Sequence, residues 1–302
     1  MRTYAIVAIA LIGASCQRHD DSGTSVAGGS ATAAGELAIK TQSGLAMKNT
    51  GVEPRRELRY HVAKGVARSL QLAIDIDMDI PGQFSGPLPT MRMIGDLAFG
   101  DAKPDGSVPM TMTVHDIHLA DRPGSPPQAA LIQKRLGVLE GFVLHGDLSP
   151  LGAMANVTTD TKNVPPDLRA QLDAMTQNLQ QIALPLPAEA VGVGATWDLS
   201  KSTEQGSMKL TTVTHFTVTK LDGDVVGFHT AVEVSAPKQT LDGSTQVELD
   251  SVTGGGSGDG TVDLGTFSIT GASTNGFRAE VSAMGQHTSM GTKMSMTMSP
   301  VE

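Results

Sequence analysis

Residues 69–80 read SLQLAIDIDMDI and carry the clearest alternation in the chain. Every second residue from Leu70 to Ile80 is apolar, and the residues between them are polar or small. Because successive side chains of a β-strand point to opposite faces, this pattern predicts a long strand with one buried and one solvated face. Such strands are typical of antiparallel sheets.

The same period of two recurs on both sides of this stretch. Apolar residues alternate with polar ones over 91–99 and 108–114, and again in several segments between 208 and 298. Asp105-Gly106 is a typical hairpin signal between two of these segments. Long strands joined by short turns predict one large curved antiparallel sheet or an incomplete barrel.

Glycines supply two further turn signals in the C-terminal half. Asn275-Gly276 is a dipeptide that favours tight hairpins. The run 254–260, GGGSGDG, has almost no side chains that a strand could pack, and it predicts a flexible loop. Its glycine spacing does not match the calcium-binding nonapeptide repeat.

The middle of the chain shows helical spacing instead. A first helix is predicted from Pro127, and a second begins after Pro165-Pro166. The second carries one apolar stripe at helical intervals, formed by Leu168, Leu172, Met175, Leu179 and Ile182. The predicted fold class is therefore mainly β with an α+β arrangement. One domain, 55–302, has β-rich halves at 55–150 and 188–302 that flank a helical connection at 151–187.

The N-terminus has the features of a secretory signal. Arg2 precedes the apolar run 5–12, and small residues lead to Cys16. The run is too short to cross a bilayer as a helix, which takes about 20 apolar residues. Gly13-Ala14-Ser15-Cys16 resembles the bacterial lipoprotein signal, in which the cysteine receives a diacylglycerol and becomes the new N-terminus. The resemblance implies a signal peptide at 1–15 and fatty acyl attachment at Cys16.

Two neighbouring positions qualify this resemblance. The lipoprotein family prefers an aliphatic residue where Gly13 stands, which leaves an ordinary secretory cleavage near Ser15 as the alternative. Gln17 follows the cysteine where an aspartate would retain a lipoprotein in the inner membrane. The resemblance therefore implies a protein of the bacterial cell envelope, anchored in the outer membrane and facing the periplasm.

The amino-acid composition bears on disulfide bonds, on the segment after the signal and on the partners that the protein can bind. Cys16 is the only cysteine, so no internal disulfide can form. The stretch 16–54 is rich in Gly, Ser, Ala and Thr and predicts a flexible tether. The formal net charge of -9 argues against nucleic acid as a partner and against a polybasic membrane-binding surface.

No motif predicts catalysis, a cofactor or a metal. Asp75, Asp77 and Asp79 suggest a calcium loop, but Ile80 and Gly86 occupy the places where an EF-hand needs Gly and Glu. His115 and His118 would point to opposite faces of a regular strand. The chain has no GxSxG, HExxH or P-loop sequence. We therefore expect a protein that is not an enzyme.

Methionines are the remaining signal, because several recur at a spacing of two on one strand face. Thioethers bind Cu(I), line adaptable apolar surfaces, or simply fill a core that is poor in aromatic residues. The candidate lining of an apolar ligand site comprises Met91, Met93, Met110, Met112, Met294 and Met296. The predicted helix would face them with Leu168, Leu172, Met175 and Leu179.

Two resemblances bear on function. The lengths and order of the predicted elements over 55–302 resemble the periplasmic lipoprotein-carrier proteins, in which helices cover an incomplete barrel with an apolar cavity. The segments LRYHVAKG (58–65) and VGVGATW (191–197) resemble uncharacterised bacterial lipoproteins, which imply no activity.

Two functions follow as expectations. The first is a non-catalytic envelope lipoprotein that binds or carries an apolar small molecule and contacts membrane lipid through its anchor. The alternative is a structural or interaction lipoprotein with a solid core that docks an envelope protein. Both functions require inward-facing apolar residues, so the sequence does not decide between a carrier and a scaffold.

Overall fold

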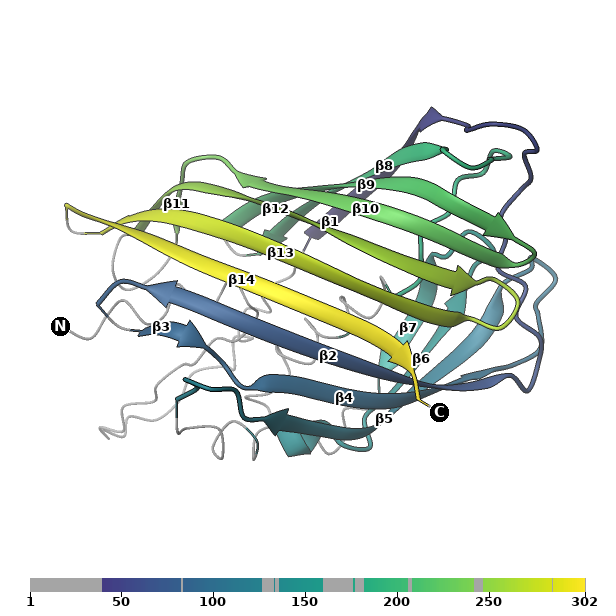
Figure 1. Ribbon diagram of the computed structural model, residues 1–302, viewed down its shortest axis with the longest axis horizontal. Coiled ribbons are helices and arrows are strands. Elements are labelled where there is room, and N and C mark those ends of the chain that lie inside the picture. The colour runs from purple at the N-terminus through teal and green to yellow at the C-terminus, as the bar shows by residue number, and fades with distance from the viewer. Residues whose placement is uncertain are drawn as a thin grey trace, which may run out of the picture.

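The computed structural model describes residues 40–82, 84–126, 136–159, 182–205, 208–241, 247–283 and 285–301, with the single positions 133 and 176. These residues form one large open antiparallel sheet of fourteen strands, which curls so that its two edges lie behind its centre (Figure 1). The strands of the first half are β1 (Lys40–Asn49), β2 (Ala67–Ile80), β3 (Phe84–Pro87), β4 (Thr90–Phe99), β5 (Val108–Ala120), β6 (Val143–Leu148) and β7 (Met154–Thr159). Those of the second half are β8 (Thr196–Gln205), β9 (Met208–Asp222), β10 (Val225–Ala236), β11 (Gln239–Leu241), β12 (Val247–Asp263), β13 (Ser268–Ala283) and β14 (Gln286–Pro300).

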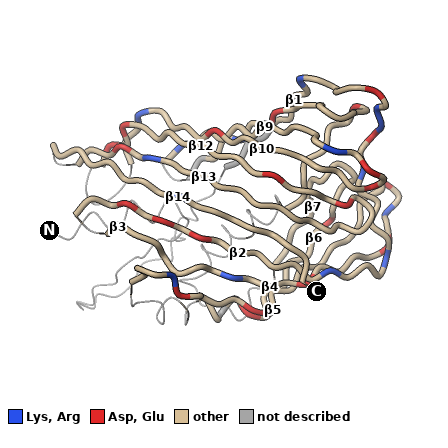
Figure 2. The backbone as a smooth tube through the Cα atoms, in the orientation of Figure 1, with Lys and Arg blue, Asp and Glu red and all other residues tan. Residues whose placement is uncertain are grey.

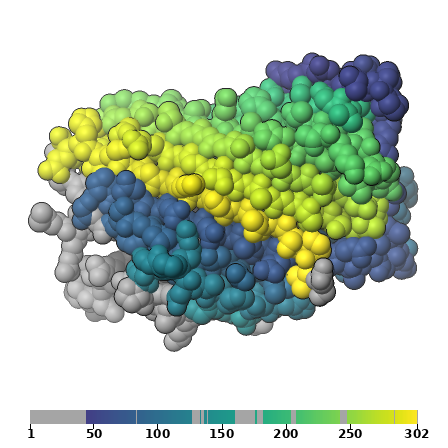
Figure 3. Space-filling view, viewed as in Figure 1, coloured from purple at the N-terminus to yellow at the C-terminus, as the bar shows by residue number. Residues whose placement is uncertain are grey.

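The sheet consists of two meanders joined along one pair of strands. Its order is β1-β8-β9-β10-β12-β13-β14-β2-β4-β5-β6-β7, with β3 on β2 and β11 on β12. Residues 291–300 of β14 pair with 70–79 of β2, so the C-terminal strand connects the two halves. The yellow atoms of β14 pack directly against the blue atoms of β2 on the face shown in Figure 3.

The α+β prediction is wrong, because the described chain is all β. No run of described residues forms an α-helix, and the helical element present is a single 3-10 turn, Gly137–Leu139. The described parts of the predicted helical connection are the strand β7 and an extended segment that begins at residue 182. The first four members of the predicted stripe, Leu168 to Leu179, lie outside the described residues, and the fifth, Ile182, is described and lines the cavity. A helical period over a few turns does not show whether a segment pairs with a distant strand, because the tertiary context decides that pairing.

The strand β1 lies inside the stretch for which composition predicts a tether. It pairs with β8 at the edge of the sheet, with Leu45 opposite Leu199 and Met47 opposite Trp197. The backbone N–H and C=O groups of β1 find hydrogen-bond partners in β8. This pairing forms a strand although the segment has a polar composition. The predicted signal peptide and the first part of the predicted tether, residues 1–39, lie outside the described residues.

Both glycine turn signals in the C-terminal half lie within strands. The run 254–260 belongs to β12, and Asn275-Gly276 lies in the middle of β13, so the predicted loop and hairpin there are wrong. Gly256 pairs with Asn275 and Gly255 with Gly276, which places the two glycine signals beside each other. Glycine in a strand often marks a bend or a close backbone approach, and both apply at this position.

The outer face of the sheet carries polar pairs across adjacent strands. His229 Nδ1 lies 2.8 Å from Asp259 Oδ1, and the hydroxyls of Thr274 and Ser295 lie 3.1 Å apart. Both pairs join residues that are directly opposite in the register. Solvated cross-strand pairs of this kind give modest stability, and they leave the apolar residues to the inner face.

One end of the inner face is closed by two loop segments, residues 50–66 and 182–195. The Arg56 amide donates to the Val191 carbonyl at 3.0 Å, and the Val191 amide donates back at 2.8 Å. Gly192 allows this approach because a Cβ there would lie 1.8 Å from the Val52 carbonyl oxygen. The two segments therefore form one interlocked cap.

The main hydrophobic core lies beneath this cap, and we call it the loop-end core. Phe267, at the β12–β13 turn, packs against Tyr60 and Phe99 with ring centroids 5.5 Å and 5.4 Å apart. Burial raises the pKa of Tyr60, whose hydroxyl donates to the Leu184 carbonyl at 3.2 Å. Further buried members include Leu58, Leu97, Val108, Leu144, Leu148, Val226 and Val262.

A second, smaller cluster packs at the opposite end of the long strands. Its buried members are Met208, Ala236, Leu249, Val252, Ala279, Val281 and Met290. Leu249 and Val252 are near the start of β12, whereas Val262 of the loop-end core is near its end. We call this group the far-end cluster. The inner face between the two clusters is the part that could hold a ligand.

Candidate functional site

The pairing register shows which residues of neighbouring strands lie side by side on the inner face of the sheet. Residues directly opposite in adjacent strands share a face, so each chain of opposed residues forms a row. One inner row consists of Trp197, Phe216, Thr230, Gly258, Ser273, Met296, Ile74 and Met91. The next row toward the far-end cluster consists of Leu199, Thr214, Val232, Gly256, Asn275, Met294 and Ile76. The row toward the loop-end core includes Phe228, Gly260, Gly271, Met298 and Leu72.

Each of these three rows has a glycine where it crosses β12. Gly256, Gly258 and Gly260 project no side chain into the inner space, whereas Val252 and Val262 at the ends of the same face are buried in the two clusters. Of the three, Gly258 borders the hollow of the inner face, and Asn275 Oδ1 and the Phe228 ring occupy the places that a Cβ on Gly256 or Gly260 would take. A cavity of about 710 Å³ lies at this position.

The glycines also let the strands approach and bend more closely than side chains would permit. A Cβ on Gly256 would lie 2.2 Å from both the Thr274 carbonyl oxygen and Asn275 Oδ1. A Cβ on Gly260 would lie 2.7 Å from Phe228 Cζ. Glycines are the residues that sheets use at tight bends, so these positions allow the sheet to curl around the cavity.

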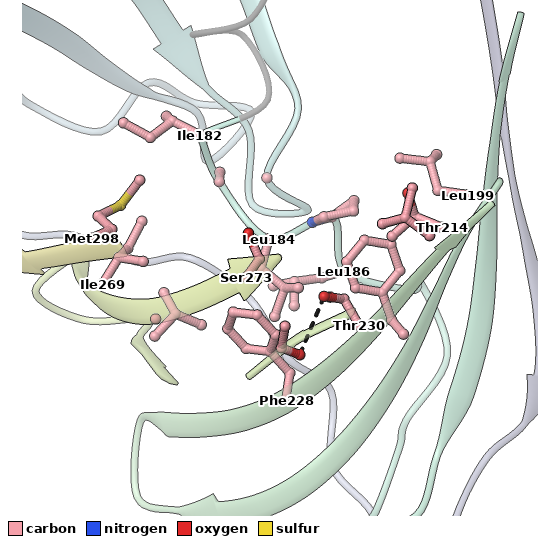
Figure 4. Close-up of a pocket in the computed structure, with 18 of the residues that line it drawn as sticks. Ile182, Leu184, Leu186, Leu199, Thr214, Phe228, Thr230, Ile269, Ser273 and Met298 are labelled. Atoms are coloured by element: carbon pink, nitrogen blue, oxygen red, sulfur yellow. Dashed lines mark hydrogen bonds between the residues drawn. The ribbon is translucent and has the colours of Figure 1, made fainter. Parts of the chain in front are cut away.

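The opposite wall comes from the segment that follows residue 182. Leu184 and Leu186 project from it into the space above the strands, close to Phe228 (Figure 4). The Leu186 amide donates to the Leu151 carbonyl at 2.9 Å, which fixes the segment. The sheet contributes Ile269 and Met298 to the same space. Most of the lining is thus aliphatic or aromatic.

Polar groups at the cavity are few. Thr230 Oγ1 donates to the Gly258 carbonyl at 3.3 Å, as drawn in Figure 4. Ser273 Oγ and Asn275 Oδ1 are buried without a hydrogen-bond partner among the described residues. Both line the cavity on β13. A few convergent polar atoms in an apolar hollow are typical of small-molecule sites.

One cationic side chain lies on this otherwise apolar face. Lys201 follows Leu199 by two residues on β8 and therefore points to the same side, opposite Thr212 of β9. It lines the cavity, and burial lowers the pKa of its ammonium group below the ordinary lysine value. No described residue forms an ion pair or hydrogen bond with its side chain.

The methionines predicted from sequence divide between the cavity and the core. Met296 lines the cavity, and Met294 lies in an inner row beside it. Met93, Met110 and Met112 are buried in the loop-end core, and Met91 packs against it. These four are not among the described lining residues.

The remaining predicted positions lie outside the described residues. These are Leu168, Leu172, Met175 and Leu179 of the predicted stripe, and the predicted lipid attachment site Cys16.

Several lining residues were missed by sequence reasoning. Phe216 and Phe228 lie in segments correctly predicted as strands, whereas Ile269 lies in a predicted segment that a turn at residues 264–267 divides. Alternation alone does not say which strands become neighbours around the cavity. Leu184 and Leu186 lie in a proline-rich segment that showed no strand or helix period. The usable signal was the period of two among Gly254, Gly256, Gly258 and Gly260, which leaves one strand face empty.

Each of the two histidines considered as metal ligands pairs with an aspartate. His115 Nε2 lies 2.6 Å from Asp96 Oδ2, and His118 Nδ1 lies 2.8 Å from Asp116 Oδ2. Hydrogen bonds from Ser69 and then from His115 lower the pKa of Asp96. Among the described ranges no three His, Cys, Asp or Glu side chains gather as a metal site.

The three acids of β2 are spaced along one face of the strand (Figure 2). Asp77 accepts a hydrogen bond from Arg122 at 3.0 Å, and Asp75 accepts one from Thr90. Within the described part of the chain, no helix is long and apolar enough to cross a bilayer.

No protein-family model matches this chain, and no curated protein matches it. The function is therefore inferred from the geometry of the cavity and its lining.

Proposed function

We propose that this protein is a non-catalytic binding or carrier protein for a small apolar molecule, which it holds in the cavity between the loop-end core and the far-end cluster. The observation that carries the proposal is the largely apolar hollow of about 710 Å³ on the inner face of the sheet. Ligand pockets typically have volumes of about 300–1,000 Å³ and mostly apolar walls.

The alternative, a scaffold with a solid core, is less well supported. Protein interiors pack as densely as organic crystals, and voids much larger than a water molecule are few. A scaffold with a solid core gains nothing from a hollow of about 710 Å³ on its inner face. A carrier, in contrast, needs that space and needs it between packed regions that keep it open.

The N-terminal sequence supports a location for this activity. The lipoprotein-like signal that ends at Cys16 favours a lipid-anchored protein of the bacterial envelope, with the binding body in the periplasm and the anchor in the outer membrane. A carrier attached in this way would meet its apolar ligand at the membrane surface.

A neutral fluorescent probe tests the proposal directly. The full-length chain carrying Cys16→Ser, which cannot be acylated, should bind N-phenyl-1-naphthylamine with one saturable site and enhanced emission. The double variant Thr214→Trp with Val232→Trp places two indoles at opposed positions of an inner row. It should weaken probe binding by about tenfold, because the indoles occupy ligand space and each lost buried CH₂ contact is worth about 0.8 kcal/mol.

A matched control places the same side chains outside. Thr274→Trp with Thr297→Trp alters exposed positions on β13 and β14, and it should leave probe affinity unchanged. Absence of saturable binding by the Cys16→Ser chain would reject the carrier and favour docking of an envelope protein. Equal weakening by the inner and outer variants would place the probe elsewhere.

A further inference from the structure

The side chain of Lys201 is a charged feature of the cavity that a purely apolar ligand does not explain. Strand alternation puts this lysine on the inner face, two residues from Leu199 and four from the fully buried Trp197. Exposed positions are available on the outer face of the same strand. A lysine on an inner face loses hydration, which disfavours its charged form.

No carboxylate in the described cavity wall neutralises this charge. The one acidic residue among the described lining residues is Asp259, and its Oδ1 lies 2.8 Å from His229 Nδ1 on the outer face. The residue opposite Lys201 on β9 is Thr212, which carries no charge. The ammonium group is thus positioned to receive an anion from the cavity.

The apolar part of the cavity lies on one side of this lysine. From the Lys201 row, the rows of Leu199, Trp197 and Phe228 follow in order toward the loop-end core. Six residues along a strand separate the first and last of these rows, which is about 20 Å at roughly 3.3 Å per residue. This distance is close to the length of an extended long-chain acyl group.

We propose that the ligand is an anionic single-chain amphiphile, a long-chain carboxylic acid, whose carboxylate pairs with Lys201 and whose tail runs along the inner face of the sheet, past Gly258, toward the loop-end core. This inference rests on the proposed function, since it names the ligand class of the same cavity. An alkyl phosphate offers the same chain and a head group that is also anionic, so the experiment distinguishes the two head groups.

The test compares a fluorescent acid with its own ester. The Cys16→Ser chain should bind cis-parinaric acid about tenfold more tightly than methyl cis-parinarate, because charge-assisted hydrogen bonds are roughly twice as strong as neutral ones. Lys201→Met should remove this preference by weakening acid binding and leaving ester binding unchanged. Lys201→Arg should restore the preference, because it keeps the charge.

A matched control and a competition complete the design. Lys293→Met removes an exposed lysine from β14 and should leave the preference intact. Displacement of the bound acid by palmitate more readily than by hexadecyl phosphate would assign the carboxylate, and the reverse order would overturn that assignment.

The outcomes separate this inference from the proposed function. Equal binding of acid and ester by the Cys16→Ser chain, with no effect of Lys201→Met, would reject the anionic head group while the apolar carrier stands. Failure of both probes to bind would reject the carrier as well. Loss of ester binding in Lys201→Met, with an unchanged circular dichroism spectrum, would show that Lys201 contributes to the cavity through its stem and not its charge.

Discussion

Replacing Gly256 with alanine is expected to lower the free energy of unfolding by about 3 kcal/mol, at the upper end of what overpacking usually costs. The added Cβ would lie 2.2 Å from the Thr274 carbonyl oxygen and 2.2 Å from Asn275 Oδ1. The first of these atoms belongs to the backbone of β13, so a side-chain rotation cannot relieve the clash. The two strands would have to separate at the point where the sheet curls around the cavity.

Gly276 on the neighbouring strand is the matched control. It is also a mid-strand glycine, but a Cβ there would meet the Thr292 carbonyl oxygen at an ordinary 3.6 Å. Gly276→Ala should therefore raise stability by about 0.5–1 kcal/mol, because glycine in a strand interior is entropically costly. Urea denaturation followed by circular dichroism measures both variants. Equal stability of the two would show that Gly256 is not needed for close strand approach.

Replacing Trp197 with alanine is expected to cost about 3–5 kcal/mol, the usual range for a fully buried large aromatic residue. Its side chain is 0% exposed, and its ring stacks on Phe216 with centroids 5.5 Å apart. Removing it would open a void between the cavity and the cap formed by the two loop segments. Trp197→Phe should cost less, because a smaller ring still fills part of the site.

Leu45 provides the comparison for this variant. It lies on the edge strand β1 and is 38% exposed, so Leu45→Ala should cost less than about 1 kcal/mol. The midpoints of urea denaturation, followed by circular dichroism, give both values. A cost for Trp197→Ala as small as that for Leu45→Ala would mean that the packing around β8 and the cap is incorrect.

Alternation predicts the strands well where each one has a single buried face. The stretch 69–80 lies wholly within β2, and 108–114 lies within β5. The hairpin signal Asp105-Gly106 lies between β4 and β5, and Gly106 has a positive φ of 81°. These features depend on local geometry, so a local pattern suffices to predict them.

The sequence pattern gives a wrong prediction at two glycine-containing segments of this chain. The run 254–260 looks like a loop because few residues in it favour a strand, and Asn275-Gly276 looks like a hairpin. Yet residues 254–260 lie in β12 and Asn275-Gly276 lies in β13, and these two strands pair with each other along their whole length. The partner strand explains why residue 256 is a glycine, because Asn275 Oδ1 and the Thr274 carbonyl oxygen occupy the place that a Cβ would take.

The cavity could be predicted only in part for a similar reason. A period of two puts Met294 and Met296 on one face, but the pairing of β14 with β2 decides what that face meets. Met110 and Met112 obey the same period and are nevertheless core residues, because they belong to the same buried cluster as Leu58 and Tyr60 of the cap. Lys201 carried no sequence signal, since a lone lysine in a polar segment is ordinary.

The most direct test of the account uses Trp197, the only tryptophan in the chain, as a reporter of an acyl chain in the cavity. Phe216 lines the cavity and stacks on Trp197, so a bromine atom at the tail of a bound ligand would lie close to the indole. The Cys16→Ser chain is titrated with methyl 16-bromohexadecanoate and, separately, with the unbrominated ester. The account predicts saturable quenching by the brominated ester alone, reversed by an excess of the unbrominated one. Emission that stays constant or falls without saturation would contradict the binding of an apolar chain in this cavity.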